Sequence, residues 1–346
     1  MKQLLSKRWY IKLSNWEYWP MWIYYIPVWI QHFWLSLKVG NLFFFLRTNP
    51  AIDGFILSDS KYRTLQLVPN ECKPKTIYVR KGSRPGDILD EIAKCEILFP
   101  VILKPDIGFR GISVKKIDNE QELAESLQNI KVDHIIQKFV DDELEIGLFY
   151  YRLPDRRTGV IPSLTIKKFL CVVGDGSSTL GQLIEGNPRS VLHLEKLRKS
   201  FKAQWNKILP TNKKMILDRI GNHNKGTEFM NGNHLVDAEL ITVFDNLSHK
   251  MEGFYFGRFD IKTPSLEALK RDHNYKILEV NGVGGEPTHI YDPGTPFLSV
   301  WIDLCAIWRV AARISKINFR NGESKPTFRE AHAKWLSYTE YKNSLR

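Results

Sequence analysis

The stretch GRFDIKTPSLEALKRDHNYKILEVNG, residues 257–282, contains two predicted strands that carry polar side chains at matching positions. Side chains alternate between the faces of a strand, so Arg258 and Asp260 share one face of the first strand. For the same reason, Glu279 and Asn281 share one face of the second. If the strands pair, Asp260, Glu279 and Asn281 meet as oxygen ligands of the kind that Mg²⁺ takes beside phosphate. The alternative is a surface ion pair of Arg258, which leaves Asn281 unexplained.

A lysine and a glycine-bearing loop precede this stretch. The sequence VILKPDIGFRGISV, residues 101–114, delivers Lys104 at the end of a strand, and a loop with Gly108 and Gly111 follows. Glycines let backbone N–H groups approach phosphate oxygens, and the lysine adds a positive charge. A second predicted strand, over residues 112–117, leaves the loop. The segment is not a P-loop because it lacks GxxxxGK[ST] and a strand follows it. An ordinary hairpin remains the alternative.

A third cluster lies between these two. Residues 134–140, HIIQKFV, form an apolar strand, and Glu145 follows shortly after it. The edge of such a strand offers backbone hydrogen bonds to a purine, and the carboxylate suits ribose hydroxyls. Taken alone, this pattern is weak, since any surface strand can carry a glutamate.

The composition describes a globular chain with a basic bias. A chain of 346 residues, 43% hydrophobic and 25% charged, can bury the core of one large or two modest domains. Its net charge of +12 fits either a solvated surface or attraction to an anion such as a nucleotide or a lipid headgroup. No basic cluster lies on a nucleic-acid-binding module, so we expect no nucleic-acid partner. The four scattered cysteines lack metal-ligand spacing and indicate reduced thiols in a cytoplasmic protein.

Aromatic residues are concentrated in residues 16–46. Two prolines interrupt this segment, and it lacks the cleavage site of a signal peptide, so a membrane-spanning helix or a leader is disfavoured. A helix over residues 28–38 would place Trp29, Phe33 and Leu37 on one face, which suits a helix lying in a membrane interface at the inner side. The same stripe suits packing on the protein's own core or on a second subunit. The sequence leaves these alternatives open.

Strands and helices alternate along the rest of the chain, which predicts an α+β body of two lobes. We expect an aromatic N-terminal segment with one strand over residues 1–60, a first lobe over 61–138, a second over 139–300 and a C-terminal helix with a polar tail over 301–346. The expected strands cover 42–46, 76–80, 100–104, 112–117, 134–140, 145–152, 161–173, 254–261 and 276–280. The expected helices cover 58–68, 87–95, 119–130, 189–207, 235–252 and 297–317, with another opening at Ser178 or Thr179. We expect the tail from Arg320 to be loosely held.

The ordered set of these motifs resembles the ATP-grasp superfamily. The set comprises Lys61, Lys104 with its glycine loop, the segment from Gln137 to Glu145, Asp260, and Glu279-Val280-Asn281. It is most similar to the carboxylate–amine ligases, the group that includes D-alanine–D-alanine ligase and cyanophycin synthetase. The resemblance covers residues 61–292. It implies a two-lobed ATP-grasp fold with mixed or antiparallel sheets and a truncated region before the first lysine.

The resemblance also implies a role for each matching residue. The expected ATP-binding residues are Lys61, Lys104, Gly108, Gly111, Ser113, Gln137, Phe139, Val140, Glu145 and Lys168, with Lys167 an equal candidate for the last. The expected ligands of one or two Mg²⁺ ions, or of Mn²⁺, are Asp260, Glu279 and Asn281. Arg258 and the backbone N–H groups of Gly284 and Gly285 are expected to stabilise an oxyanion. The expected acceptor loop holds Asn222, His223 and Lys225, although His223 also suits a plain turn. The segment GDGSSTL, residues 174–180, resembles a motif of the cyanophycin-synthetase type.

The implied reaction is transfer of the ATP γ-phosphoryl group to a small-molecule carboxylate, followed by attack of an amine, or of a thiol, on the acylphosphate. Two other functions are weighed against it. One is a membrane-associated ligase of a cell-envelope precursor, which would use the aromatic segment. The other is a nucleotide-binding scaffold without catalysis. The sequence GGEPTH, residues 284–289, departs from the peptide ligases, so we expect a different carboxylate pocket.

Overall fold

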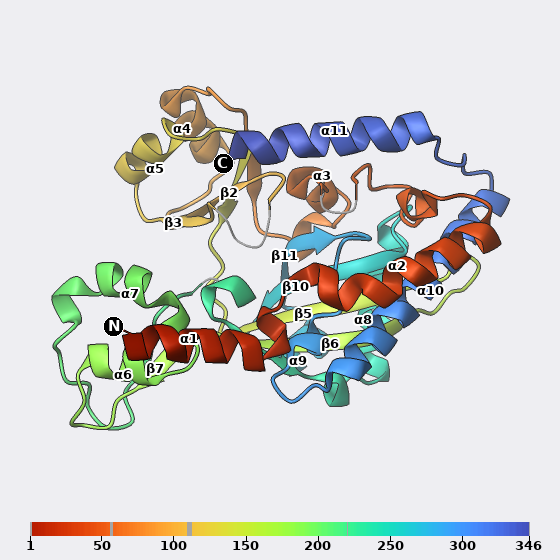
Figure 1. Ribbon diagram of the computed structural model, residues 1–346. Coiled ribbons are helices and arrows are strands. Elements are labelled where there is room, and N and C mark those ends of the chain that lie inside the picture. The colour runs from red at the N-terminus through yellow and green to blue at the C-terminus, as the bar shows by residue number, and fades with distance from the viewer. Residues whose placement is uncertain (1, 56–57, 109–112, 220, 346) are drawn as a thin grey trace.

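The described residues assemble into three antiparallel sheets and their covering helices (Figure 1). The computed structural model describes residues 2–55, 58–108, 113–219 and 221–345. The predicted α+β class is confirmed. The strands are β1 (Thr76–Val79), β2 (Val101–Pro105), β3 (Lys115–Ile117), β4 (His134–Lys138), β5 (Leu144–Tyr151), β6 (Val160–Lys168), β7 (Cys171–Val173), β8 (Lys214–Ile216), β9 (Glu228–Asn231), β10 (Phe256–Thr263) and β11 (Lys276–Asn281). The α-helices are α1 (Lys2–Ser14), α2 (Met21–Val39), α3 (Lys61–Gln66), α4 (Pro85–Lys94), α5 (Glu120–Leu127), α6 (Leu180–Gly186), α7 (Leu194–Ser200), α8 (Ala238–Lys250), α9 (Leu266–Arg271), α10 (Phe297–Arg320) and α11 (Phe328–Leu345).

The first lobe is a four-stranded sheet in the order β1-β4-β2-β3, with α4 and α5 packed on it. Its central strands β2 and β4 pair with Leu103 opposite Ile136, and both side chains are buried. The side chain of Asn119 accepts a hydrogen bond from the Glu122 N–H and caps α5, as its position before an acidic first turn predicts. This lobe holds Lys104 at the end of β2.

The second lobe is a five-stranded sheet in the order β11-β10-β5-β6-β9. Helices α8 and α9 cover its apolar face, where Phe244 of α8 packs against Phe259 of β10. Between β10 and β11 the register shifts after the pair Asp260–Glu279, so that Ile261 lies opposite Ile277. This irregularity leaves Leu278 without an opposite residue, and its carbonyl is free to accept bonds from the first lobe.

A smaller unit interrupts the second lobe. The prediction of one continuous strand over 161–173 is wrong, because β6 ends at Lys168 and β7 pairs with β8 in a separate two-stranded sheet. Leu170 and Val172 belong to the core of this unit, which α6 and α7 complete. The predicted long helix over 189–207 is also wrong: three short helices replace it, the longest being α7. Trp205 ends this segment packed directly over Gly181, a position where a side chain would clash.

The N-terminal segment packs on the C-terminal helix α10 and forms one core with it. The buried positions Tyr24, Val28, Leu35 and Val39 of α2 follow the spacing of a helix face. The strand predicted over 42–46 is wrong, because Phe44–Arg47 forms a 3-10 helix whose apolar side chains enter this core.

The tail is ordered as helix α11, which runs from the second lobe back to the first (Figure 1). The expectation of a loosely held tail is therefore wrong. The Tyr341 hydroxyl lies 3.2 Å from the Ile107 N–H, which donates to it, and 3.2 Å from the Asp133 carbonyl, to which it donates. Near the other end of α11, Glu330 pairs with Arg47 at 2.9 Å. Within the described part of the chain, every helix is too short or too polar to cross a bilayer.

Candidate functional site

A cavity of about 760 Å³ lies where the two lobes face each other. Its lining comes from β2 and β4 of the first lobe, from β5, β6, β10 and β11 of the second, and from α2. The charged side chains gather at the lobe junction, and apolar and aromatic side chains from α2 line another part of the wall. The site is therefore built from elements more than two hundred residues apart in the sequence.

The acidic and amide side chains of β10 and β11 meet in this cavity. Asp260 lies directly opposite Glu279 in the sheet register, and Arg258 lies opposite Asn281. Arg258 Nη2 donates to Asp260 Oδ2 at 3.2 Å, and the Asn281 amide lies 3.4 Å from the same oxygen. With its amide turned over, Asn281 donates to Glu279 Oε1 at 3.1 Å and accepts from Arg258 at 3.3 Å. Strand alternation and pairing thus bring the four side chains together.

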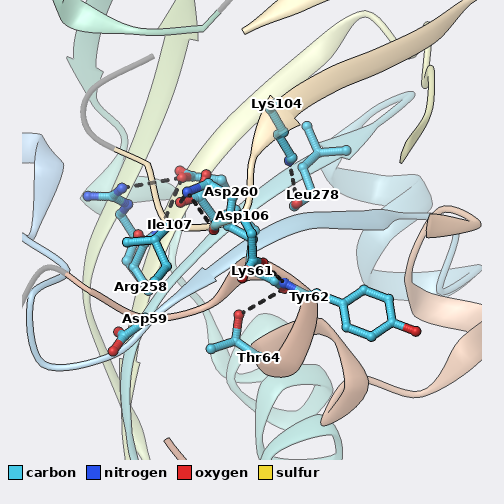
Figure 2. A network of polar contacts seen from close by, with 12 residues as sticks. Asp59, Lys61, Tyr62, Thr64, Lys104, Asp106, Ile107, Arg258, Asp260 and Leu278 are labelled. Carbon is cyan, nitrogen blue, oxygen red and sulfur yellow. Dashed lines mark hydrogen bonds and ion pairs between the residues drawn. The ribbon is translucent and has the colours of Figure 1, made fainter. Parts of the chain in front are cut away.

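Lysines from three elements surround these carboxylates. Lys61, at the start of α3, lies 3.5 Å from Glu279 Oε1. Lys104 Nζ donates to the Leu278 carbonyl and to Gln137 Oε1, each at 3.0 Å, as Figure 2 shows for the first of these bonds. Burial lowers the pKa of Lys104 to about 8, while the charge of Glu279 opposes that change.

The third lysine is Lys167, which lies 2.9 Å from Glu145 and 3.0 Å from Asp260. Burial would raise the pKa of Asp260, but Arg258 and Lys167 hold this pKa well below its ordinary value. Lys168 is exposed and is not part of the cavity wall. Since neighbouring strand residues point to opposite faces, Lys167 faces the cavity and Lys168 faces away from it, and a phosphate contact by either lysine stays a prediction.

The loop after β2 is tied to α3. Asp106 accepts from the Tyr62 N–H at 2.8 Å, and its carbonyl accepts from the Lys61 N–H at 3.0 Å (Figure 2). Gly108 lines the cavity, and a Cβ atom there would lie 2.9 Å from Lys61 Nζ, so a glycine leaves room for the ammonium group of this lysine. Gly111, predicted to cover phosphates, lies outside the described residues. Ser113 is exposed, with a positive φ of 58°, and is not among the described lining residues.

The residues predicted to hold adenine and ribose line the cavity at the lobe junction. They are Gln137, Phe139, Val140 and Glu145. Gln137 donates to the Leu278 carbonyl at 3.3 Å, next to the bond from Lys104, and so links β4 to β11. The roles of these residues in binding adenine and ribose stay predictions.

The predicted acceptor loop is placed only in part at the cavity. Asn222 and His223 line it, whereas Lys225 lies outside the lining, near Asp218. His223 lies 2.8 Å from Glu17, which also accepts from Arg189 at 3.0 Å. Sequence reasoning missed Glu17, because a pair 206 residues apart leaves no local signal. Both interpretations of His223, as part of an acceptor loop and as a turn residue, stay predictions.

Of the two glycines predicted to stabilise an oxyanion, Gly284 and Gly285 differ in their surroundings. The Gly285 N–H donates to the Gly282 carbonyl at 2.9 Å, so in this conformation it does not offer the predicted bond to an oxyanion. Gly284 lines the cavity. Arg258 donates to the Glu286 carbonyl at 3.3 Å, while its buried Nε has no hydrogen-bond partner among the described residues. A free N–H of this kind suits an oxygen of a bound ligand.

The donor set at β10 and β11 fits magnesium. Two carboxylates and an amide oxygen, Asp260, Glu279 and Asn281, are hard ligands that leave room for phosphate oxygens and water. Lys61, Lys167 and Arg258 balance these charges in the structure. Among the described residues, no group of three or more His, Cys, Asp and Glu side chains is arranged so that it could hold a metal ion.

Several solved structures are similar to this chain. VanG D-Ala:D-Ser ligase from Enterococcus faecalis is 13% identical over 72% of this chain and 61% of its own, with a TM-score of 0.41. D-alanine–D-alanine ligase from Bacillus anthracis, complexed with ATP, is 14% identical over 75% and 68%, with a TM-score of 0.42. A bifunctional glutathione synthetase from Pasteurella multocida is 14% identical over 70% and 35%, with a TM-score of 0.38.

The likeness is one of structure at low sequence identity. The chain spans 61% and 35% of the length of the D-Ala:D-Ser ligase and of the glutathione synthetase. D-alanine–D-alanine ligase, with which the sequence motifs were compared, is among the matched structures. No protein-family model matches the sequence, and no curated protein matches it.

Proposed function

We propose that this chain is an ATP-grasp ligase, which binds Mg²⁺–ATP between its lobes and joins a carboxylate to an amine. The observation that carries the proposal is the register of β10 and β11, which sets Asp260 opposite Glu279 with Asn281 beside them. Lys61 and Lys167 contact these carboxylates from two other elements. A cluster of hard oxygen ligands ringed by lysines suits a metal-bound triphosphate.

In the proposed reaction, the γ-phosphoryl group leaves ADP and bonds to a carboxylate oxygen of the substrate, giving an acylphosphate. Asp260 and Glu279 would hold Mg²⁺, which would neutralise charge on the phosphate oxygens. The lysines hold the phosphates in line, and the free Nε of Arg258 stabilises charge on the reacting carboxylate. An amine then attacks the carbonyl carbon, and phosphate leaves. Most of the rate enhancement would come from positioning and preorganised charge.

The cavity wall favours substrates that carry an apolar portion. Tyr24, Val28 and Trp29 of α2 line the cavity together with Val283, which neighbours Gly284. Burying apolar groups against such a wall contributes about 0.8 kcal/mol per methylene. This observation supports the second candidate, a ligase acting on an amphipathic envelope precursor, over a ligase of small polar amino acids.

The test is ADP release from Mg²⁺–ATP in the presence of paired carboxylates and amines, graded from polar to apolar. We expect release that needs both partners and rises with the apolar portion, and we expect Asp260→Asn to abolish it. Undiminished release by Asp260→Asn would contradict the metal assignment. Tight nucleotide binding without release for any pair would instead support the scaffold.

A further inference from the structure

Helix α2 is apolar on two opposite sides. Its inner side is buried, and its outer side exposes Trp22, Ile26, Trp29, Phe33 and Leu37, spaced three or four residues apart. These side chains are between 41% and 61% exposed. Ile30 and Trp34 of the same helix are also exposed, and we name these seven residues of α2 the aromatic face. Exposed apolar side chains gathered in this number mark an interaction surface.

A row of basic side chains borders the aromatic face. Helix α10 lies beside α2 (Figure 1), with Arg309 donating to Gln31 and Lys316 donating to the Lys38 carbonyl. Along the exposed side of α10, apolar residues give way to a basic stripe, defined by Arg309, Arg313, Lys316 and Arg320. Helix α2 has no acidic residue, and Asp303, the one acid of α10, pairs with His289. The uncompensated charge of this surface is therefore positive.

We propose that the aromatic face and the basic stripe bind an anionic lipid surface. Tryptophan and tyrosine prefer the membrane–water interface because the ring is apolar and its N–H or O–H stays hydrated. Basic groups beside them are attracted to anionic headgroups. A second copy of the chain fits less well, because a symmetric contact would bring two basic stripes towards each other. The proposal does not depend on the ligase assignment, since it rests on residues outside the charged part of the cavity.

Trp29 connects this surface to the cavity. Its side chain is 55% exposed on the aromatic face and also belongs to the cavity wall. A chain docked through this face would hold the α2 side of the cavity close to the lipid. An apolar portion of a substrate could then stay near the bilayer while its polar group reaches the lobe junction.

The test is co-flotation of the full-length protein with vesicles of phosphatidylcholine, with and without phosphatidylserine. We expect binding to the anionic vesicles that falls with added salt. Arg313→Gln with Arg320→Gln should weaken it about 25-fold, because each basic group near an anionic surface contributes about 1 kcal/mol and 1.4 kcal/mol is tenfold. Phe33→Ser with Leu37→Ser should weaken it at least about tenfold.

Matched controls come from the first lobe. Arg84→Gln with Lys94→Gln makes the same change of charge on exposed positions at α4, and Leu98→Ser removes an apolar side chain that is even more exposed than Phe33 and Leu37. Both controls should bind like the wild type. Failure of the wild-type protein to bind anionic vesicles, or equal losses in the controls, would overturn the proposal. A dimer in sedimentation that Phe33→Ser with Leu37→Ser dissociates, without vesicle binding, would assign the face to a second copy instead.

Discussion

Replacing Glu279 with glutamine tests the proposed metal site with the smallest change of shape. The substitution keeps the size of the side chain and removes one negative charge from the pair with Asp260. In the structure, Glu279 meets Lys61 at 3.5 Å, with the two side chains 26% and 9% exposed. The effects on the fold and on nucleotide binding can therefore be estimated separately.

The cost to the fold should be small. The gross attraction of unit charges at 3.5 Å is about 5 kcal/mol at an effective dielectric constant of about 20. Desolvation and solvent screening reduce the net value of such a partly exposed pair to about 1 kcal/mol or less. Loss of a preorganised charge at a reacting phosphate costs about 10²- to 10³-fold in turnover, which is about 3–4 kcal/mol. Binding and turnover should thus suffer much more than stability.

Calorimetry gives the affinity for a non-hydrolysable ATP analogue, once in the presence of Mg²⁺ and once in the presence of EDTA. Unfolding in urea gives the stability of the same variants. Wild-type protein should bind more tightly with Mg²⁺, and Glu279→Gln should lose most of that difference. Glu330→Gln is the matched control, because Glu330 pairs with Arg47 at 2.9 Å, is 29% exposed and lies away from the cavity. Unchanged Mg²⁺ dependence in Glu279→Gln would refute the metal role of β11.

Three further predictions concern the lysines and the fold. Burial lowers the pKa of Lys104 to about 8, so affinity for the nucleotide should fall as pH rises through 8 to 10, and binding should take up a proton. In calorimetry, Lys104→Met should abolish this dependence of affinity on pH. An unchanged dependence in Lys104→Met would assign it to another group. Lys167→Met should weaken nucleotide binding at least about tenfold, while Lys168→Met should leave it unchanged. A larger loss in Lys168→Met than in Lys167→Met would assign the phosphate contact to Lys168. Thr179→Ala removes the capping bond to the Gln182 N–H and should lower the free energy of unfolding, measured in urea, by about 1 kcal/mol without changing nucleotide affinity. A loss of affinity would show that the unit formed by β7, β8, α6 and α7 influences nucleotide binding in the cavity.

Strand periodicity was enough to predict the acidic part of the site. It placed Arg258 with Asp260, and Glu279 with Asn281, before any pairing was known, and the register joins the two sets. Periodicity could not tell which face of β6 is buried, so Lys167 and Lys168 were equivalent in the sequence. That choice depends on the partner strands β5 and β9.

Features that depend on tertiary packing could not be predicted from local patterns in the sequence. The pair of Glu17 with His223 joins residues far apart in the chain, and the inner wall of α2 follows from its docking on α10. The register shift after Asp260 is likewise a property of the pair of strands. Helix α11 has a polar sequence typical of a tail, and Tyr341 fixes it to the first lobe through backbone groups.

The measurement that addresses the proposed site most directly is an anomalous-scattering map of crystals grown with Mn²⁺ and a non-hydrolysable ATP analogue. We predict a manganese peak about 2.0–2.3 Å from oxygens of Asp260, Glu279 or Asn281, with the triphosphate between Lys61, Lys104 and the metal. A nucleotide bound elsewhere, or a metal peak away from β10 and β11, would contradict the assignment of this cavity as a metal–nucleotide site.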